Sequence, residues 1–495
     1  MRKFLSVLLA MAMVLSLTVT GFAIEDTATT REPEVMTEEA TMAGKTVILH
    51  TNDVHGAIEG YAYITALKAD YEAKGAEVIL VDAGDYSQGE VYVSDTKGLD
   101  AVEMMNVTGY DVVTLGNHEF DYGYAQLKEN MTKADFKILC ANVYGEDGTP
   151  IFDANYTYTT KSGVKIGFFG METPEAQTKA NPALIKGLKF DTDLKAVAEK
   201  QLEALKDDDV VIALSHLGVD DSSKPYTSYD LYNAAKGIDF IIDGHSHSVM
   251  IKGKNGEPIQ STGTKFANIG VIVIDDASKK IESNSLYEIK EDTAKDAAVA
   301  AAAQKIIDRI DKEYGAVFAK SKVELNGAKA PNGNRDGETN NGDLITDAML
   351  WKVMQNKEGL TVNEDHVVAI TNGGGIRATI KKGDITKKDI NTVLPFGNTV
   401  AVIYVTGAEL LEALEASTYS LPVGGFPQVA GINFTLSTAV AYDANAETYP
   451  ASTYYGPKSI NRVTIESING KPFDKDATYA VITNDFLAAG GDIYY

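Results

Sequence analysis

The sequence predicts an α/β fold built from two domains, and three observations support this prediction. The chain has 495 residues, which is more than one domain usually holds. From Lys45 to about Lys290, short apolar runs alternate with helical stretches, as they do in α/β proteins. An Ala-rich helical stretch follows, after which new strands and helices begin near Val323.

The N-terminal stretch is expected to lie outside the folded domains. Residues 1–23 have the features of a secretory signal peptide, because Arg2 and Lys3 precede an apolar stretch that ends in small residues at Ala23. A retained membrane anchor is the alternative. Residues 24–44 are acidic and without periodicity, which predicts a disordered leader. No later segment is long and apolar enough to span a bilayer. We therefore expect a secreted protein, located extracellularly, at the cell surface or in the periplasm of a diderm bacterium.

The rest of the chain divides into a first domain over residues 45–291, a linker helix over residues 292–322 and a second domain over residues 323–495. The linker is predicted because the stretch is Ala-rich and has isoleucines, such as Ile306 and Ile310, at helical spacing. A core helix within one domain is the alternative. Helices are expected in the first domain at residues 67–73, 193–206 and 229–236, and in the second at residues 344–355 and 407–416, with a strand at residues 366–371.

The charge balance narrows the class of ligand. With 45 basic and 70 acidic residues, the formal net charge is −25, and such a surface repels polymeric nucleic acid and anionic lipid. A small anionic ligand would therefore need local positive charge from metal ions or arginines. The single cysteine, Cys140, lies in an apolar run and rules out an intramolecular disulfide.

Metal-binding residue types follow five of the predicted strands in the first domain. The carboxyl ends of strands in open α/β sheets form a common site. Imidazole, carboxylate and amide ligands suit divalent ions such as Zn, Mn, Co, Fe or Mg, and the lack of thiolate argues against a structural zinc site. Taken singly, each motif is also compatible with a surface turn. Seven ligands fit two ions, with Asp85 as the natural bridging carboxylate. The seven candidates are Asp53, His55, Asp85, Asn117, His216, His245 and His247.

Four segments of the second domain carry candidates for a nucleotide site. A triple-glycine turn lets the backbone approach a ligand closely, and an arginine after it can bind a phosphate through two hydrogen bonds. Aromatic side chains on loops can clamp a planar base, and a carboxylate can accept hydrogen bonds from ribose hydroxyls. Each feature alone is also common in ordinary loops. The candidates are Arg335, Asn372, Arg377, Phe396, Phe486 and Asp492.

Together these motifs resemble those of a known family. The segments "ILHTNDVHG", "DAGDYSQG", "TLGNHEFDYG", "SHLG" and "DGHSHS" resemble the calcineurin-like metallophosphoesterase domain. With the second-domain segments, they resemble the secreted bacterial 5′-nucleotidase / UDP-sugar hydrolase family over residues 45–495. The resemblance implies a four-layer αββα sandwich, a connecting helix and a smaller α/β nucleotide-binding domain.

The resemblance also implies roles for individual residues. One metal ion would be held by Asp53, His55, Asp85 and His247, and the other by Asp85, Asn117, His216 and His245. His118 would stabilise the transition state and be oriented by Asp121; a structural role for His118 is the alternative. Glu119, His50 and His366 are expected to be structural. In the second domain, Arg335 and Arg377 would contact phosphate, Asn372 the nucleoside, Phe396 and Phe486 the base, and Asp492 the ribose.

Two features depart from the family pattern. Pro331 stands where some relatives have a second arginine, one turn before Arg335, so phosphate binding would be weaker or differently tuned. The chain also stops at "GGDIYY", where relatives usually continue, which leaves open a truncation of the second domain. Tyr494 and Tyr495 would then be frayed.

The resulting hypothesis is a secreted two-metal 5′-nucleotidase. Its substrates would be nucleoside 5′-phosphates, with nucleotide di- and triphosphates or UDP-sugars as further candidates, and a hinge near residues 292–325 would bring the domains together. A 2′,3′-cyclic-nucleotide phosphodiesterase with 3′-nucleotidase activity is an alternative in the same class. A cell-surface nucleotide- or host-binding protein is the alternative in another class, although a binding module has no use for an open two-metal site. The metal identity and the oligomeric state stay open.

Overall fold

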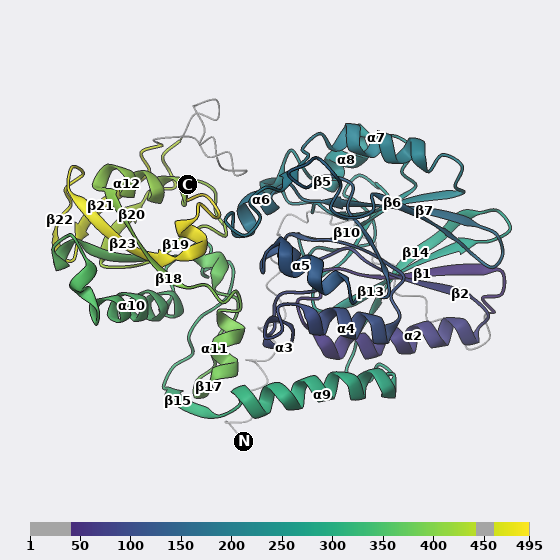
Figure 1. Cartoon of the computed structure of the whole chain (residues 1–495), viewed down its shortest axis with the longest axis horizontal. Coiled ribbons are helices and arrows are strands. Elements are labelled where there is room, and N and C mark those ends of the chain that lie inside the picture. The colour runs from purple at the N-terminus through teal and green to yellow at the C-terminus, as the bar shows by residue number, and fades with distance from the viewer. Residues whose placement is uncertain (1–40, 442–459, 495) are drawn as a thin grey trace, which may run out of the picture. The chain divides into compact units, whose positions relative to one another are not determined.

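The computed structural model describes residues 41–441 and 460–494 (Figure 1). The predicted signal peptide and residues 24–40 of the predicted leader lie outside the described residues. The prediction of disorder is wrong for residues 41–44, because Met42 is buried in the core and its backbone N–H donates to the carbonyl of Lys74 at 2.8 Å. An apolar side chain at the edge of the core is enough to hold this short segment.

The first domain contains two six-stranded sheets. In the first sheet, β1 to β4 are parallel neighbours, while β13 and β14 are antiparallel. Its order is β14 (Lys280–Glu288), β13 (Asn268–Asp275), β1 (Lys45–Thr51), β2 (Glu77–Asp82), β3 (Val112–Thr114) and β4 (Lys137–Leu139). In the second sheet, β7, β9, β10 and β12 are parallel neighbours. Its order is β11 (Val249–Met250), β12 (Ile259–Thr262), β10 (Phe240–Asp243), β9 (Val210–His216), β7 (Lys165–Glu172) and β6 (Asn155–Thr159).

The two sheets are layered between helices. Successive side chains of a strand point to opposite faces, and in β1 Val47 and Leu49 pack in the cluster that includes the helices, while Ile48 packs between the sheets with Ile212 and Ile242. Because both faces are buried, the strands are continuous apolar runs. The helices α2 (Tyr61–Ala73), α4 (Leu99–Thr108) and α5 (Tyr124–Met131) contribute to the first cluster, and α7 (Leu194–Ala204) and α8 (Ser228–Ala234) cover the second sheet. The predicted four-layer αββα sandwich is confirmed.

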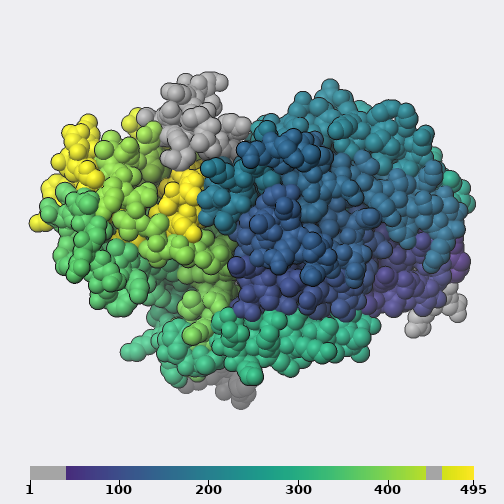
Figure 2. Space-filling view, viewed as in Figure 1, coloured from purple at the N-terminus to yellow at the C-terminus, as the bar shows by residue number. Residues whose placement is uncertain are grey.

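Helix α9 (Ala297–Tyr314) is shorter than the predicted linker over residues 292–322. The carboxylate of Asp296 caps its start by accepting from two backbone N–H groups. Its buried face, with Val299 and Ile310 among others, belongs to the core of the first domain, and its other face lies on the surface in Figure 2. The helix ends before β15 (Val317–Ser321), which pairs with β17 (Gly383–Thr386). The β-branched and aromatic residues that open β15 favour a strand there.

The second domain is a smaller α/β unit. Its four-stranded sheet has the order β18 (Val400–Thr406), β23 (Thr478–Asn484), β16 (Val367–Asn372) and β19 (Pro427–Ala430). A three-stranded sheet has the order β20 (Ile432–Leu436), β21 (Val463–Ile468) and β22 (Lys471–Pro472). Its helices are α10 (Asn340–Met354), α11 (Lys387–Val393), α12 (Gly407–Ala416) and α13 (Asp485–Ala488).

Further short elements lie in the first domain. They are α3 (Val91–Ser94), α6 (Ala176–Lys179), β5 (Val143–Tyr144) and β8 (Lys189–Phe190). Within the described residues, none of the helices combines the length and the apolar character needed to cross a bilayer.

If α9 is part of the first-domain core, Ile310→Ala should lower the free energy of unfolding by about 3 kcal/mol, because a fully buried isoleucine leaves a cavity. Ile307→Ala on the same helix is the matched control, since Ile307 is only partly buried, and about 1 kcal/mol is expected. Urea unfolding of the mature chain measures both. Equal urea midpoints for the two variants would identify α9 as a linker outside the core.

Candidate functional site

The predicted metal ligands lie at the carboxyl ends of parallel strands from both sheets. Asp53 and His55 follow β1, Asp85 follows β2 and Asn117 follows β3; His216 ends β9, and His245 and His247 follow β10. Five of these residues adopt positive φ angles, a region that side-chain-bearing residues rarely occupy and that clusters at functional sites. They are Asp53 (51°), His55 (47°), Asp85 (63°), His245 (72°) and His247 (53°). Backbone hydrogen bonds hold these turns, including Asp53 N–H to Gly84 O at 2.9 Å and His55 N–H to Asp85 O at 3.0 Å.

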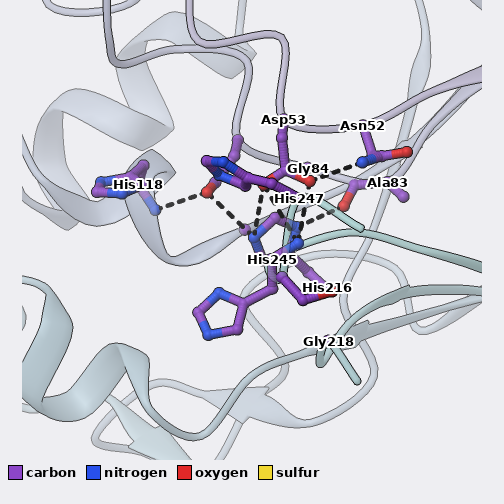
Figure 3. A network of polar contacts seen from close by, with 12 residues as sticks. Asn52, Asp53, Ala83, Gly84, His118, His216, Gly218, His245 and His247 are labelled. Atoms are coloured by element: carbon purple, nitrogen blue, oxygen red, sulfur yellow. Dashed lines mark hydrogen bonds and ion pairs between the residues drawn. The ribbon is translucent and has the colours of Figure 1, made fainter. Parts of the chain in front are cut away.

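Five of the seven predicted ligands form two overlapping groups that could hold metal ions. Figure 3 shows three of these five, Asp53, His216 and His247, close together. One group is Asp53, His55 and His247, the other is Asp53, Asp85 and His216, and within each the ligand atoms lie within 4.8 Å of one another. His247 Nε2 is 3.3 Å from Asp53 Oδ1, and His216 Nε2 is 3.1 Å from Asp85 Oδ2. His55 Nε2 is 3.8 Å from both carboxylates. Asp53 is thus common to both groups, and the bridging role of Asp85 stays a prediction.

Hydrogen bonds prepare the histidines for metal binding. His216 Nδ1 is 2.6 Å from the carbonyl of Ala83, and His55 Nδ1 is 3.0 Å from that of Gln88. Since only an N–H can donate to a carbonyl, Nε2 of each ring is the atom that can bind a metal ion. Asn117 Oδ1 is buried and has no hydrogen-bond partner among the described residues. Such an orphaned polar atom fits a ligand for an ion.

The electrostatics favour ionised carboxylates in this cluster. Burial would raise the pKa of Asp53, but His247 and His216 outweigh it and lower that pKa to about 2. Burial also acts against the charged form of Asp85, whose pKa is held well below its usual value by His216 and His118. Burial lowers the pKa of His216, yet Asp85 and Asp53 raise it well above the usual histidine value. A metal ion on His216 would therefore displace a proton.

His245 is not part of either group. Its Nε2 lies 2.7 Å from the carboxylate of Glu175, which also accepts from the Ser223 hydroxyl at 3.1 Å. With Nε2–H donating to Glu175, the lone pair of the His245 ring is on Nδ1. Carboxylates commonly orient metal-binding histidines in this way. Glu175 was not predicted, although it follows the end of β7 (Lys165–Glu172) by three residues, as Asp85 follows the end of β2.

His118 and its neighbours occupy the loop after β3. His118 Nδ1 is 2.6 Å from Asp121 Oδ2, which leaves Nε2 available to a ligand, and the His118 backbone N–H donates to Asp85 Oδ1 at 2.9 Å. Glu119 accepts from the backbone N–H groups of Asp85, Tyr86, Ser87 and Gly116. Glu119 therefore ties the loops after β2 and β3 together. Of the remaining histidines, His50 is buried within β1.

A cavity of about 340 Å³ joins this cluster to the second domain. Its walls include Asp85, Asn117, His118, Asp121, His245 and His247 from the first domain. All six residues predicted for the nucleotide site also line it, namely Arg335, Asn372, Arg377, Phe396, Phe486 and Asp492. The cavity thus combines metal-ligand candidates with cations, aromatic rings and a carboxylate.

The second-domain wall is held by close backbone packing and hydrogen bonds. A Cβ atom on Gly373 would lie 1.7 Å from the carbonyl oxygen of Asn334, so the triple-glycine turn has no space for a side chain at that position. Asn372 Nδ2 donates to Asp492 Oδ2 at 2.8 Å. The guanidinium of Arg377 lies 5.6 Å from the centroid of the Phe396 ring, a cation–π distance.

The end of the described chain is packed. Asp492 has a φ of 52°, and its backbone N–H donates to the carbonyl of Thr178 at 2.7 Å. Tyr494 packs beside Val423 and Phe426, and its hydroxyl donates to the carbonyl of Gly425 at 2.9 Å. The expectation of a frayed Tyr494 is therefore wrong, and Tyr495 lies outside the described residues.

Comparisons with known proteins agree with this architecture. The family described as "Calcineurin-like phosphoesterase" matches residues 46–249, and the one described as "5′-nucleotidase, C-terminal domain" matches residues 317–495. A 5′-nucleotidase of Vibrio cholerae is 29% identical over 92% of this chain and 87% of its own length. The trifunctional nucleotide phosphoesterase protein YfkN of Bacillus subtilis is 30% identical over 90% of this chain, which spans only 32% of the length of YfkN. The crystal structure of a 5′-nucleotidase precursor from Thermus thermophilus is 28% identical, covers 91% of both chains and has a TM-score of 0.74.

Because binding to His216 must displace a proton, the affinity of the metal-free protein for Mn²⁺ should rise with pH. We expect binding to weaken about tenfold for each pH unit below neutrality. Calorimetric titration of the folded, chelator-treated protein between about pH 6 and 8 measures this dependence, with His366→Ala as a control that keeps the wild-type profile. A Kd for Mn²⁺ that does not change with pH would contradict the assignment.

Proposed function

We propose that this chain is a two-metal 5′-nucleotidase. It belongs to the family in which a calcineurin-like phosphoesterase domain precedes a 5′-nucleotidase C-terminal domain. The family is one of phosphoric ester hydrolases, and the proposal names the substrate as a nucleoside 5′-phosphate. The observation that carries it is that metal-ligand candidates line the same cavity as Arg377, Phe396 and Asp492.

The metal ions would be held by residues at the strand ends. The carboxylates, imidazoles and orphaned Asn117 amide oxygen fit divalent ions. A pair of such ions supplies Lewis acidity and lowers the pKa of water to near neutrality. Of the seven predicted ligands, His245 would bind through Nδ1 while Glu175 holds its ring.

His118 would act on the phosphoryl group from the side of the cavity. Its Nδ1 is held by Asp121 at 2.6 Å, so Nε2 can donate a hydrogen bond to an oxygen on which negative charge develops. Asp121 would fix the tautomer and orientation of the ring. Arg335 and Arg377 would bind the phosphate oxygens, since a guanidinium matches the geometry of an oxyanion.

The nucleoside would lie along the second-domain wall. Phe396 and Phe486 would hold the base, and Asn372 and Asp492 would bind the nucleoside hydroxyls through their hydrogen-bonded pair. This nucleoside wall supports a 5′-nucleotide over a cyclic nucleotide as the substrate.

Other parts of the hypothesis stay open. Nucleotide di- and triphosphates and UDP-sugars remain candidate substrates, and the hinge near residues 292–325 stays a prediction. The sequence of residues 1–23 supports secretion.

Phosphate release from AMP by the mature chain tests the function. We expect hydrolysis with Mn²⁺ or Zn²⁺ that stops when a chelator is added. His118→Ala should lower kcat by a factor of about 10³, since a donor to the transition state is lost, while AMP binding survives. Wild-type protein that binds AMP with full metal content but never hydrolyses it would contradict the proposal and favour a binding role.

Asp492→Asn tests the nucleoside wall. Asparagine accepts the positive φ of this position but removes the charge that would accept hydrogen bonds from ribose. We expect KM for AMP to rise about tenfold, the equivalent of one charge-assisted hydrogen bond. Hydrolysis of p-nitrophenyl phosphate, which has no ribose, is the control and should stay within about twofold of wild type. Equal losses on both substrates would count against a ribose contact.

A further inference from the structure

Lys329 is a cavity residue that the sequence analysis did not single out. It lies on a second-domain loop between Leu325, whose backbone pairs with Ile380, and Arg335. Its Nζ atom is 3.2 Å from Nδ1 of His247. The loop therefore carries an ammonium group from the second domain to a predicted metal ligand of the first.

Three cations share this wall of the cavity. Lys329, Arg335 and Arg377 all line it. Burial and the charges of both arginines lower the pKa of Lys329 to about 7, although Asp53 acts in the opposite direction. Like charges held together cost free energy unless an anion lies among them. Within the described residues, the one side-chain hydrogen bond of Lys329 is to His247, which carries no negative charge. The arrangement thus suits an anionic ligand.

The His247 ring lies between Lys329 and the predicted metal site. Its Nε2 atom is 3.3 Å from Asp53 Oδ1 and 3.1 Å from His55 Nε2, whereas its Nδ1 atom is the one next to Lys329. Lys329 therefore stands at the border between the metal-ligand candidates and the two arginines that line the same cavity.

We propose that Lys329 is a phosphate-positioning residue whose ammonium binds the substrate phosphate beside Arg335 and Arg377 in the metal-loaded protein. Lys329 supplies the positive charge that Pro331 does not provide, from a position two residues earlier in the chain. This inference rests on the proposed function, because it takes the ligand of the cavity to be a phosphate ester.

The test compares Lys329→Met, which keeps the length of the side chain without its charge, with Lys329→Arg. Lys322→Met is the matched control, since Lys322 is an exposed lysine outside the cavity. Calorimetry with inorganic phosphate on the Mn²⁺-loaded full chain should show about tenfold weaker binding for Lys329→Met. KM for AMP should rise by a similar factor, with kcat within about threefold and adenosine affinity unchanged. Lys329→Arg should recover most of the phosphate affinity, and Lys322→Met should match wild type.

Manganese content and affinity are measured in parallel. Mn²⁺ affinity in Lys329→Met should equal or exceed that of wild type, because a cation next to His247 has been removed. Unchanged phosphate affinity in Lys329→Met would overturn the proposal, and so would a loss of phosphate binding that merely follows a loss of Mn²⁺. A wild-type chain that binds phosphate but does not hydrolyse AMP would count against the proposed function alone, since the phosphate titration still tests Lys329.

Discussion

The candidate site depends on one constraint: parallel strands from two stacked sheets must end at the same place. Strands β1 to β3 of one sheet and β9 and β10 of the other meet this constraint, because apolar residues fill the space between the sheets. Beyond the strand ends, the chain turns through left-handed conformations at residues that carry candidate metal-ligand side chains, such as Asp53 and His247. Each such residue costs about 1 kcal/mol relative to ordinary backbone. These conformations persist because the sheets and the hydrogen bonds between loops hold the backbone of these turns in place.

Hydrogen bonds to carboxylates fix the positions of the site's loops and of one of its histidines before a ligand binds. Glu119 ties the Asp85 and Asn117 loops together through backbone N–H groups, and Glu175 orients His245. In a chain with a net charge of −25, positive charge is gathered where the cavity meets the second domain, through Arg335 and Arg377. An anion can then be bound locally by a protein whose overall charge repels it.

Much of this could be predicted from sequence because the signals are local. A predicted strand followed by Asp-x-His or Gly-Asn-His indicates both which residues could bind a metal ion and that they lie at the edge of a sheet. The ligand candidates could therefore be identified from the sequence. The helix after the first domain was predicted too long, because the Ala-rich pattern does not show where pairing with β17 takes over at Val317. Glu175 and Lys329 were missed for a different reason. Each acts through a tertiary contact, with His245 or His247, that no spacing in the sequence encodes.

The proposed function requires two divalent ions at the meeting point of the strand ends, within the cavity that would also receive the nucleotide. Anomalous diffraction from crystals of the Mn²⁺-loaded chain with a non-hydrolysable AMP analogue would locate both ligands. We expect two manganese peaks about 4 Å apart beside Asp53 and Asp85, with the phosphate of the analogue next to them. A single peak elsewhere, or an analogue bound away from these carboxylates, would overturn the two-metal proposal.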